Sequence, residues 1–528
     1  MLTVRVLPGD RSITVAEADG RDLLSVLATH GILLESECGG EGTCGKCLVE
    51  LLEGTLTGIS GGAAEPDRGG LYLACRIRAD SDCTIRISGQ ACESSSPEEF
   101  LAASIGPFAA GPSPSGRLGV AVDIGTTTVV ALLADLESGS ALAVRSETNP
   151  QRSFGADVIS RIAFAVGAGG EEPGIGVLQR VVVECIDRLI GRACEAAGAT
   201  LSGVESIVCV GNTPMQHFLL GVTPVRLGCL PYQAEFKEVD PRPAGSLGLA
   251  SVPRATLRVL PNVASFVGAD TVGCLLAVDS EQPGGLSVMV DMGTNTEMVT
   301  GRGEDRAACS AAAGPAFEGA RLQHGMRAVP GAIGRVWLEE DHLAFETIGG
   351  ERPLGICGSG VVDAVACLRR LGVIEVNGRM AGRAEYVLAE AAESGTGHAI
   401  TITRQDVREI QLVKASIATG LGFLLERSGA GYGDIERFFV AGAFGNYLDI
   451  ENSRSIGLLP DLPPERFRPV GDAALKGACL ALTGGRRTLD RARDIAFATA
   501  HVELAGSPDF QPRFIEALGL APYGRQPF

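Results

Sequence analysis

A short pattern occurs twice in this chain, and it constrains the fold more than any other feature. Residues 120–128 read VAVDIGTTT and residues 288–296 read VMVDMGTNT, so both match V-x-V-D-x-G-T-x-T. In each copy an apolar run typical of a buried strand ends at an aspartate, a glycine permits a tight turn, and threonines follow. A duplicated strand and turn predicts two related subdomains that face one another.

The sequence on either side of residue 118 predicts two kinds of domain. Residues 118–528 alternate apolar strands with helical stretches, which indicates an α/β fold too large for one core and therefore divided into two lobes. Residues 1–90 instead predict a small α+β domain. Residues 91–117 are rich in Ser, Pro, Gly and Ala and predict a flexible linker. Within the first domain we expect a hairpin over 2–7 and 12–16, a helix over 20–30, and strands over 47–54, 72–79 and 82–88.

Four cysteines have a spacing close to that of an iron–sulfur site. Residues 38–47 read CGGEGTCGKC, and a further cysteine follows in LYLACRI. Plant-type [2Fe–2S] proteins use C-x4-C-x2-C and a distant fourth cysteine, and one inserted residue separates this chain from that spacing. Glycines between the cysteines allow the backbone to approach the sulfurs of a cluster. The predicted metal ligands are Cys38, Cys44, Cys47 and Cys75.

Zinc and a redox disulfide remain the alternatives for this loop. Structural zinc usually takes two closely spaced cysteine pairs, whereas here Cys75 stands alone. The fifteen cysteines are an odd number, and a disulfide framework is not expected in a reducing compartment. We therefore favour a [2Fe–2S] cluster and interpret Cys83, Cys92 and most other cysteines as packing residues.

The two aspartates and the turns after them are candidate nucleotide ligands. Backbone N–H groups and hydroxyls at such a turn bind phosphate oxygens, and an aspartate can hold Mg²⁺ through water. One such turn is weak evidence, whereas two facing turns can hold one nucleotide from both sides. We predict Mg-ATP binding, with Asp123 and Asp291 as the catalytic residues. The predicted nucleotide-binding residues of the two turns are Gly125, Thr126, Thr127, Gly293, Thr294 and Asn295.

A third glycine-rich turn follows the apolar strand in FFVAGAFGNYL, residues 438–448. Gly442, Ala443 and Gly445 are small enough to let an adenine ring lie against the backbone. In this order the three motifs resemble the first phosphate, second phosphate and adenosine motifs of the actin, sugar-kinase and heat-shock-ATPase superfamily. That resemblance implies two lobes built from duplicated ribonuclease-H-like units, with Mg-ATP between them.

Residues 1–90 resemble a [2Fe–2S] ferredoxin of the β-grasp fold.

The combination of these two domains resembles the reductive activators of corrinoid-dependent enzymes. The resemblance implies that the chain uses ATP to deliver one electron to a Co(II) corrinoid and thereby restores Co(I). It also implies a corrinoid protein or corrinoid-dependent methyltransferase as partner and an upstream low-potential electron donor, and a homodimer is compatible with it. Stretches that carry the resemblance further include NPQRSFGADVISRI (149–162), PNVASFVGADTVG (261–273), AGPAFEGA (313–320) and GICGSGVVDAV (355–365).

The charge of the chain excludes some partners. A net charge of −18 argues against general nucleic-acid binding and against adsorption on anionic membranes. The first residues lack the apolar core of a signal peptide, and no apolar run is long enough for a transmembrane helix. We expect a cytoplasmic protein.

Two other functions remain open on the sequence alone. A redox-regulated small-molecule kinase would use the same ATP site with a phosphate acceptor, and a non-enzymatic actin-like module would sense redox state without turnover. The residue that positions the attacking water is also open. Gln151, Asp157 and Asp270 lie in stretches that resemble the family, but residues in such places are more often structural.

Overall fold

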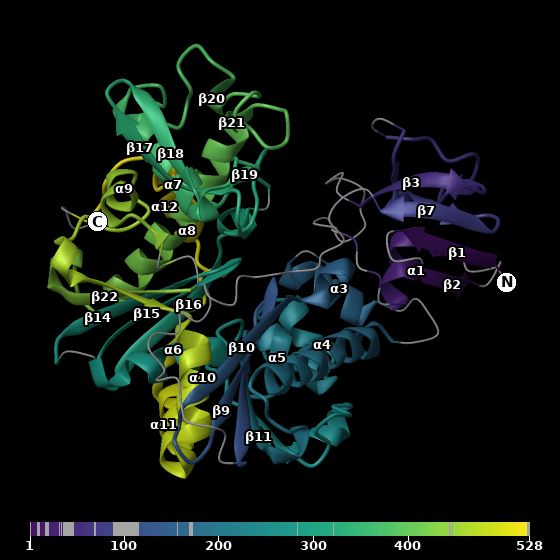
Figure 1. Ribbon diagram of the computed structural model, residues 1–528. Coiled ribbons are helices and arrows are strands. Elements are labelled where there is room, and N and C mark those ends of the chain that lie inside the picture. The colour runs from purple at the N-terminus through teal and green to yellow at the C-terminus, as the bar shows by residue number, and fades with distance from the viewer. Residues whose placement is uncertain are drawn as a thin grey trace.

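A computed structural model shows a small N-terminal domain beside two larger lobes (Figure 1). The described residues are 2–7, 11–15, 21–30, 32, 34, 47–67, 70–87, 116–155, 157–167, 173–281, 284–319, 321–442, 445 and 447–524. The predicted linker over 91–117 falls almost entirely on residues outside these ranges, so the linker and its boundaries stay predictions.

The N-terminal domain contains a mixed sheet and a short helix. Its elements are β1 (Leu2–Leu7), β2 (Arg11–Val15), α1 (Leu23–Thr29), β3 (Leu48–Glu53), β4 (Leu56–Gly58), β5 (Tyr72–Leu73), η1 (Ala74–Arg76), β6 (Ile77–Ala79) and β7 (Cys83–Ile87). The sheet order is β2-β1-β7-β3-β5, with β1 and β7 parallel. Alternate residues of β1, such as Val4 and Val6, point into a core that Leu23 and Leu27 of α1 also fill.

One predicted strand of this domain is wrong. Residues 72–79 do not form a continuous strand, because the chain leaves the sheet after Leu73 and turns through η1. It then continues as β6, which pairs with β4 in a separate two-stranded sheet. The predicted hairpin at the start of the chain and the strand near residue 85 are confirmed. The turn at η1 brings Cys75 inward, towards Cys47.

The two larger lobes contain sheets with the same strand arrangement. The first lobe holds β8 (Leu118–Ile124), β9 (Thr128–Asp135), β10 (Ala141–Thr148), β11 (Val204–Gly211), β12 (Arg242–Pro243) and β13 (Thr256–Val259). The second holds β14 (Leu286–Met292), β15 (Asn295–Arg302), β16 (Asp305–Ala312), β22 (Ile435–Ala441), β23 (Phe467–Gly471) and β24 (Ala500–His501). In each sheet neighbouring strands among the first three are antiparallel, and the last two run parallel to the third strand. The orders are β10-β9-β8-β11-β13 and β16-β15-β14-β22-β23. The expected duplication is therefore present in the fold.

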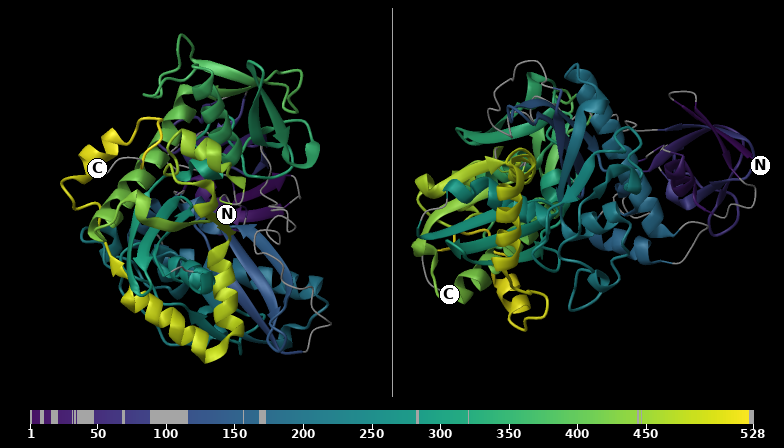
Figure 2. Two further views of the ribbon diagram at one scale, coloured as in Figure 1. Left: turned by 90° about the vertical axis from the view of Figure 1, so that its left-hand side faces the viewer. Right: turned by 90° about the horizontal axis from the view of Figure 1, so that it is seen from below.

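Helices cover the outer faces of both sheets and fill the layer between them (Figure 2). The helices of the lobes are α3 (Val158–Val166), α4 (Gly174–Ala196), α5 (Thr213–Leu220), α6 (Ala269–Val278), α7 (Gly358–Arg370), α8 (Arg404–Arg427), α9 (Ile450–Ser455), α10 (Ala473–Thr483), α11 (Gly485–Ala498) and α12 (Phe510–Glu516). Helix α4 packs on β9 and β10, and α8 packs on β15 and β16. The inner helices α6 and α10 share one core with strands of both sheets. Additional strands of the second lobe are β17 (Ala332–Glu339), β18 (His342–Thr347), β19 (Gly355–Ile356), β20 (Glu385–Ala389) and β21 (Ile400–Thr403).

The lobes are joined where α6 and α10 cross at two glycines. A Cβ atom on Gly273 would lie 2.8 Å from the carbonyl oxygen of Ala474, and one on Gly477 would collide with the carbonyl oxygen of Gly273. Only glycine fits where backbones approach this closely. Helix α6 leads from the first lobe into the second, and α10 returns to β8 and β11, so a side chain at this crossing would force the lobes apart.

The N-terminal domain lies beside the first lobe in Figure 1 and in the right-hand view of Figure 2. Its helix α1 contacts the short turn η2 (Pro150–Phe154) of that lobe. Among the helices of the described residues, none combines the length and apolarity needed to cross a membrane.

Candidate functional site

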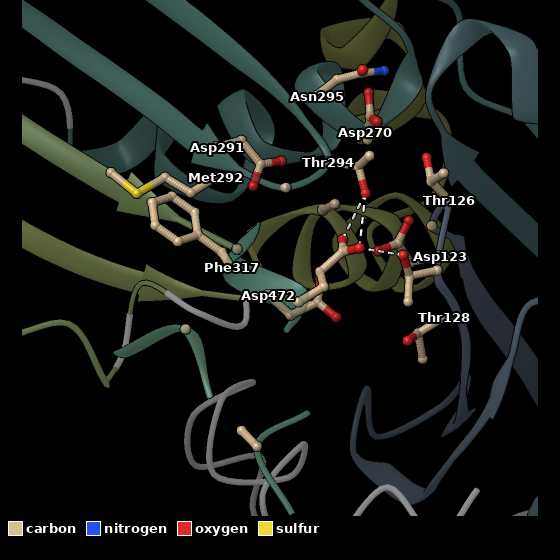
Figure 3. Close-up of a pocket in the computed structure, with 18 of the residues that line it drawn as sticks. Asp123, Thr126, Thr128, Asp270, Asp291, Met292, Thr294, Asn295, Phe317 and Asp472 are labelled. Carbon is tan, nitrogen blue, oxygen red and sulfur yellow. Dashed lines mark hydrogen bonds between the residues drawn. The ribbon is translucent and has the colours of Figure 1, made fainter. Parts of the chain in front are cut away.

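A cleft of about 300 Å³ lies between the lobes, and both duplicated turns open into it (Figure 3). The first turn joins β8 to β9 and the second joins β14 to β15. Asp123 and Asp291, the aspartates of the repeat, stand near the ends of β8 and β14 and line the cleft from opposite lobes. The sequence repeat therefore forms two hairpins on facing walls.

Glycines shape the walls of this cleft. A Cβ atom on Gly125 would lie 2.7 Å from the carbonyl oxygen of Thr128. Gly442 has a φ of +94° and lies against the carbonyl of Met292, so its turn and the second phosphate turn are in close contact. Gly293 also lines the cleft. Other predicted residues that line it are Thr126, Thr127, Thr294 and Asn295. Gly445 follows in the third turn without being among the lining residues, and Ala443 lies outside the described residues.

Several carboxyl groups share the cleft and raise one another's pKa. Burial, and then the charges of Asp472, Asp270 and Asp291, raise the pKa of Asp123 well above its usual range. Burial and the charge of Asp291 raise the pKa of Asp270 to about 7. Burial raises the pKa of Asp472 to about 6, with Asp291 adding to the shift. A bound cation would stabilise these groups as carboxylates.

The donor set of the cleft suits Mg²⁺ held together with a nucleotide. Among the described residues no group of three carboxylate, imidazole or thiol side chains is placed to hold a metal ion by itself. Mg²⁺ in nucleotide sites keeps several waters and takes only one or two carboxylates besides the phosphates. The facing aspartates and the threonine hydroxyls of the two turns match that requirement.

The first phosphate turn is held by the segment that follows β10. Asn149 donates from its backbone nitrogen to the carbonyl oxygen of Thr127 at 2.8 Å and from Nδ2 to that of Gly125 at 2.8 Å. Arg161 of α3, which is fully buried, donates from Nη2 to the carbonyl oxygen of Thr126 at 2.6 Å. Three consecutive carbonyls of the turn are thus fixed by a segment that includes η2, which α1 of the N-terminal domain contacts.

Only one of the three candidates for positioning water lines the cleft. Gln151 is buried and donates from Nε2 to the carbonyl oxygen of Leu178 at 2.9 Å. Asp157 caps α3 by accepting a hydrogen bond from the backbone nitrogen of Ser160 at 2.8 Å. Both therefore have structural roles, whereas Asp270 lines the cleft.

A residue that the sequence did not single out connects the two turns. Glu318, at the end of η7 (Pro315–Glu318), accepts hydrogen bonds from Oγ1 of Thr127 and from Oγ1 of Thr294. Thr294 Oγ1 lies 2.9 Å from each carboxylate oxygen, and Figure 3 draws these bonds as dashed lines from Thr294. Because Thr127 belongs to the first lobe and Glu318 to the second, this interaction crosses the cleft. In the sequence, Glu318 lies within AGPAFEGA, one of the stretches that carry the family resemblance.

Two of the four predicted metal ligands come together in the N-terminal domain. Cys47 and Cys75 are 1% and 3% exposed, and their Sγ atoms lie 3.3 Å apart. Pairing of Leu48 with Leu73 and a hydrogen bond from the Ala74 nitrogen to the Cys47 oxygen bring them there. Buried thiols this close together suit a thiolate-ligated iron cluster. Cys38, Cys44 and Cys92 lie outside the described residues, so their roles stay predictions.

Cys83 has the environment of a packing residue. It is buried on β7, and burial, followed by the charge of Asp82, raises the pKa of its thiol to about 11. A buried thiol in such surroundings packs as a small apolar residue.

Three family models match the chain in succession. They are described as a 2Fe-2S iron-sulfur cluster binding domain (residues 7–80), the RACo middle region (residues 118–282) and the C-terminal domain of RACo, the ASKHA domain (residues 285–528). These matches confirm the expected fold classes, a ferredoxin-like domain followed by an actin-like domain.

Individual relatives share most of the chain. The corrinoid activation enzyme RamQ of Eubacterium limosum is 36% identical over 411 residues, which make up 74% of this chain and 68% of that protein. The Co(II) methylated amine-specific corrinoid protein reductase of Methanosarcina barkeri is 30% identical over 377 residues, or 65% of this chain and 66% of that protein. A solved structure described as a reductive activator for corrinoid,iron-sulfur protein has a TM-score of 0.71 and 30% identity and covers 98% of both chains.

Proposed function

Since the chain belongs to the family of reductive activators of corrinoid proteins, we propose that it uses Mg-ATP to deliver one electron to the Co(II) corrinoid of a methyltransferase or corrinoid protein. Co(II) is thereby reduced to Co(I). The observation that carries this proposal is a contact between the two domains that carry its two sites. Helix α1 of the cysteine domain contacts η2, and the segment containing η2 holds the first phosphate turn.

The N-terminal domain supplies the electron-transfer site in this proposal. Cys47 and Cys75 present a pair of buried sulfurs, and Cys38 and Cys44 complete the proposed ligand set. When bound, a plant-type [2Fe–2S] cluster would store one electron at a reduction potential of about −400 mV. Each turnover consumes one electron, so we propose an upstream low-potential donor.

The cleft supplies the nucleotide site. Asp123 and Asp291 hold Mg²⁺, while the hydroxyl and backbone donors of the facing turns, including Thr126, Thr294 and Asn295, bind the phosphates. The small residues Gly442, Ala443 and Gly445 are proposed to let the adenine lie against the backbone. A coupling free energy of 1–3 kcal/mol between nucleotide and partner binding changes an equilibrium by roughly 5–150-fold. That range is enough for ATP to favour the state competent for electron transfer.

The partner is a corrinoid protein in this proposal, in line with the names of the relatives. A homodimer through the actin-like domain is part of the same proposal. The two remaining functions make different predictions: a kinase requires a small phosphate acceptor, and an actin-like redox sensor requires no electron transfer to cobalt.

Two variants, each removing one site, test the proposal. Cys44→Ala should abolish the visible absorption of the cluster and the reduction of a Co(II) corrinoid protein, while Mg-ATP binding by calorimetry stays within about threefold of wild type, because the sites lie in separate domains. Asp291→Ala should keep the absorption and lose the response to ATP. Reduction of the corrinoid protein by Cys44→Ala, or a response to ATP retained by Asp291→Ala, would contradict the proposed function.

A further inference from the structure

Glu318 differs from the other carboxylates of the cleft in its partners. Asp291 lies 3.5 Å from the thiol of Cys274, Asp472 caps α10 by accepting from the Leu475 nitrogen, and Glu297 is buried and accepts from Ser310. Glu318 instead accepts hydroxyl hydrogen bonds from both phosphate turns. Its carboxylate thus lies between the groups that would bind the terminal phosphate of a nucleotide.

The backbone around Glu318 fixes this position. Gly319 has a φ of +81°, and a Cβ atom there would lie 2.5 Å from the carbonyl oxygen of Met326. A Cβ atom on Gly358, the first residue of α7, would collide with the carbonyl oxygen of Phe317. The turn η7 is therefore packed between two stretches of backbone without room for side chains. A carboxylate on such a rigid turn is held in a defined place relative to the second phosphate turn.

We propose that Glu318 is the catalytic base of ATP hydrolysis, an assignment that rests on the proposed function. Thr127 and Thr294 donate hydrogen bonds to its carboxylate. A bound terminal phosphate takes these hydroxyls as its own donors, since it lies between the same two turns. The carboxylate then faces the phosphate and accepts a hydrogen bond from the attacking water.

An oxygen–phosphorus bond forms between water and the terminal phosphorus. The bond from that phosphorus to the oxygen shared with the neighbouring phosphate breaks, and ADP leaves with the electron pair. One proton of the water moves to the Glu318 carboxylate and from there to solvent.

Glu318→Gln tests this assignment because it keeps the size of the side chain and removes the base. We expect phosphate release from Mg-ATP to fall by roughly 10²–10⁴-fold, the usual contribution of a general base. Binding of a non-hydrolysable ATP analogue should stay within about threefold, since the phosphate donors are unchanged. Binding of ADP with aluminium fluoride, which mimics the transition state, should weaken by more than that. Glu318→Asp should be intermediate.

A matched control is Glu339→Gln, which neutralises an exposed glutamate at the end of β17 and should hydrolyse ATP like wild type. If the wild-type protein binds Mg-ATP but never releases phosphate, the chain does not hydrolyse ATP. That result would overturn both this part of the proposed function and the assignment of Glu318. Hydrolysis by wild type together with equal hydrolysis by Glu318→Gln would overturn the assignment alone. So would a variant that loses analogue binding and hydrolysis in parallel, because that result indicates a structural role.

Discussion

Individual carboxyl groups in the cleft make cation binding depend on pH. The pKa values of Asp270 and Asp472, about 7 and about 6, lie above the value of 3.8 for an unperturbed aspartate. Between about pH 4 and pH 7, and without a cation, the folded protein therefore binds more protons than the unfolded chain. These groups consequently lower the stability of the folded protein as the pH rises through that range. Mg²⁺ reverses this loss only when the groups are deprotonated.

We predict that Mg²⁺ with ADP raises the melting temperature more at about pH 8 than at about pH 5.5, because protonated carboxyls attract no cation. Thermal unfolding at the two pH values measures this difference. Asp270→Asn should reduce the pH dependence, whereas Asp341→Asn, in the exposed turn between β17 and β18, should leave it unchanged. An equal effect of Mg²⁺ at both pH values would show that these carboxyls do not face the cation.

Two buried cysteines of the N-terminal domain should respond differently to the same substitution. Cys75 lies 3.3 Å from Cys47, whereas Cys83 packs on β7 with its pKa raised to about 11 by burial and by Asp82. We predict that Cys75→Ser loses the visible absorption and bound iron, and that Cys83→Ser keeps both. Iron content and absorption spectra of the two purified variants decide the point. Loss of iron in both variants would instead indicate that the fold of the domain is sensitive to any change in its core.

The sequence predicted Asp123 and Asp291, which stand at strand ends, but not Glu318, which lies on the short turn η7. Asp123 and Asp291 follow buried strands in a repeated pattern, and strand ends of related sheets lie in related places. Glu318 reaches Thr127 across 191 positions of sequence. That approach depends on how η7 packs against Met326 and α7, which local patterns do not encode.

At the scale of elements, the crossing of α6 and α10 leaves no room for a side chain at Gly273 or Gly477. We predict that Gly477→Val destabilises the protein by about 1–3 kcal/mol or more, because the new side chain collides with Gly273. Nucleotide binding should weaken as well, since the lobes carry facing halves of the site. Denaturant unfolding and calorimetry measure the two effects.

The control for this crossing is another helical glycine with open space around it. A Cβ atom on Gly191, within α4, would meet no atom within 4 Å beyond the neighbouring backbone of its own helix. Gly191→Ala should therefore stabilise the protein by up to about 1 kcal/mol through helix propensity. A Gly477→Val variant as stable as wild type would contradict the close crossing.

Elements with regular patterns were predictable, and those set by tertiary contacts were not. The apolar runs of β8 and β14 are buried throughout most of their length, so their periodicity identified them. Residues 72–79 alternate like a strand, yet η1 interrupts them where Cys75 turns towards Cys47. The interruption goes with the tertiary contact between Cys75 and Cys47, which the local sequence pattern does not encode.

At the scale of the whole molecule, the order of the domains could be predicted from composition and motifs, but their placement could not. The contact between α1 and η2 joins segments that share no sequence pattern. It places the cysteine domain against the segment whose Asn149 and Arg161 hold the first phosphate turn. We expect nucleotide binding at that turn to change how the cysteine domain is held, because the same segment contacts both.

The most direct measurement follows the absorption of a purified Co(II) corrinoid protein after mixing with the chemically reduced wild-type protein, without oxygen, in the presence and absence of Mg-ATP. We predict that Co(I) forms, or methylcobalt when a methyl donor is added, and that omitting ATP slows its formation by roughly 5–150-fold. Equal rates with and without ATP, or no Co(I) with any corrinoid protein tested, would contradict ATP-dependent electron delivery by this chain.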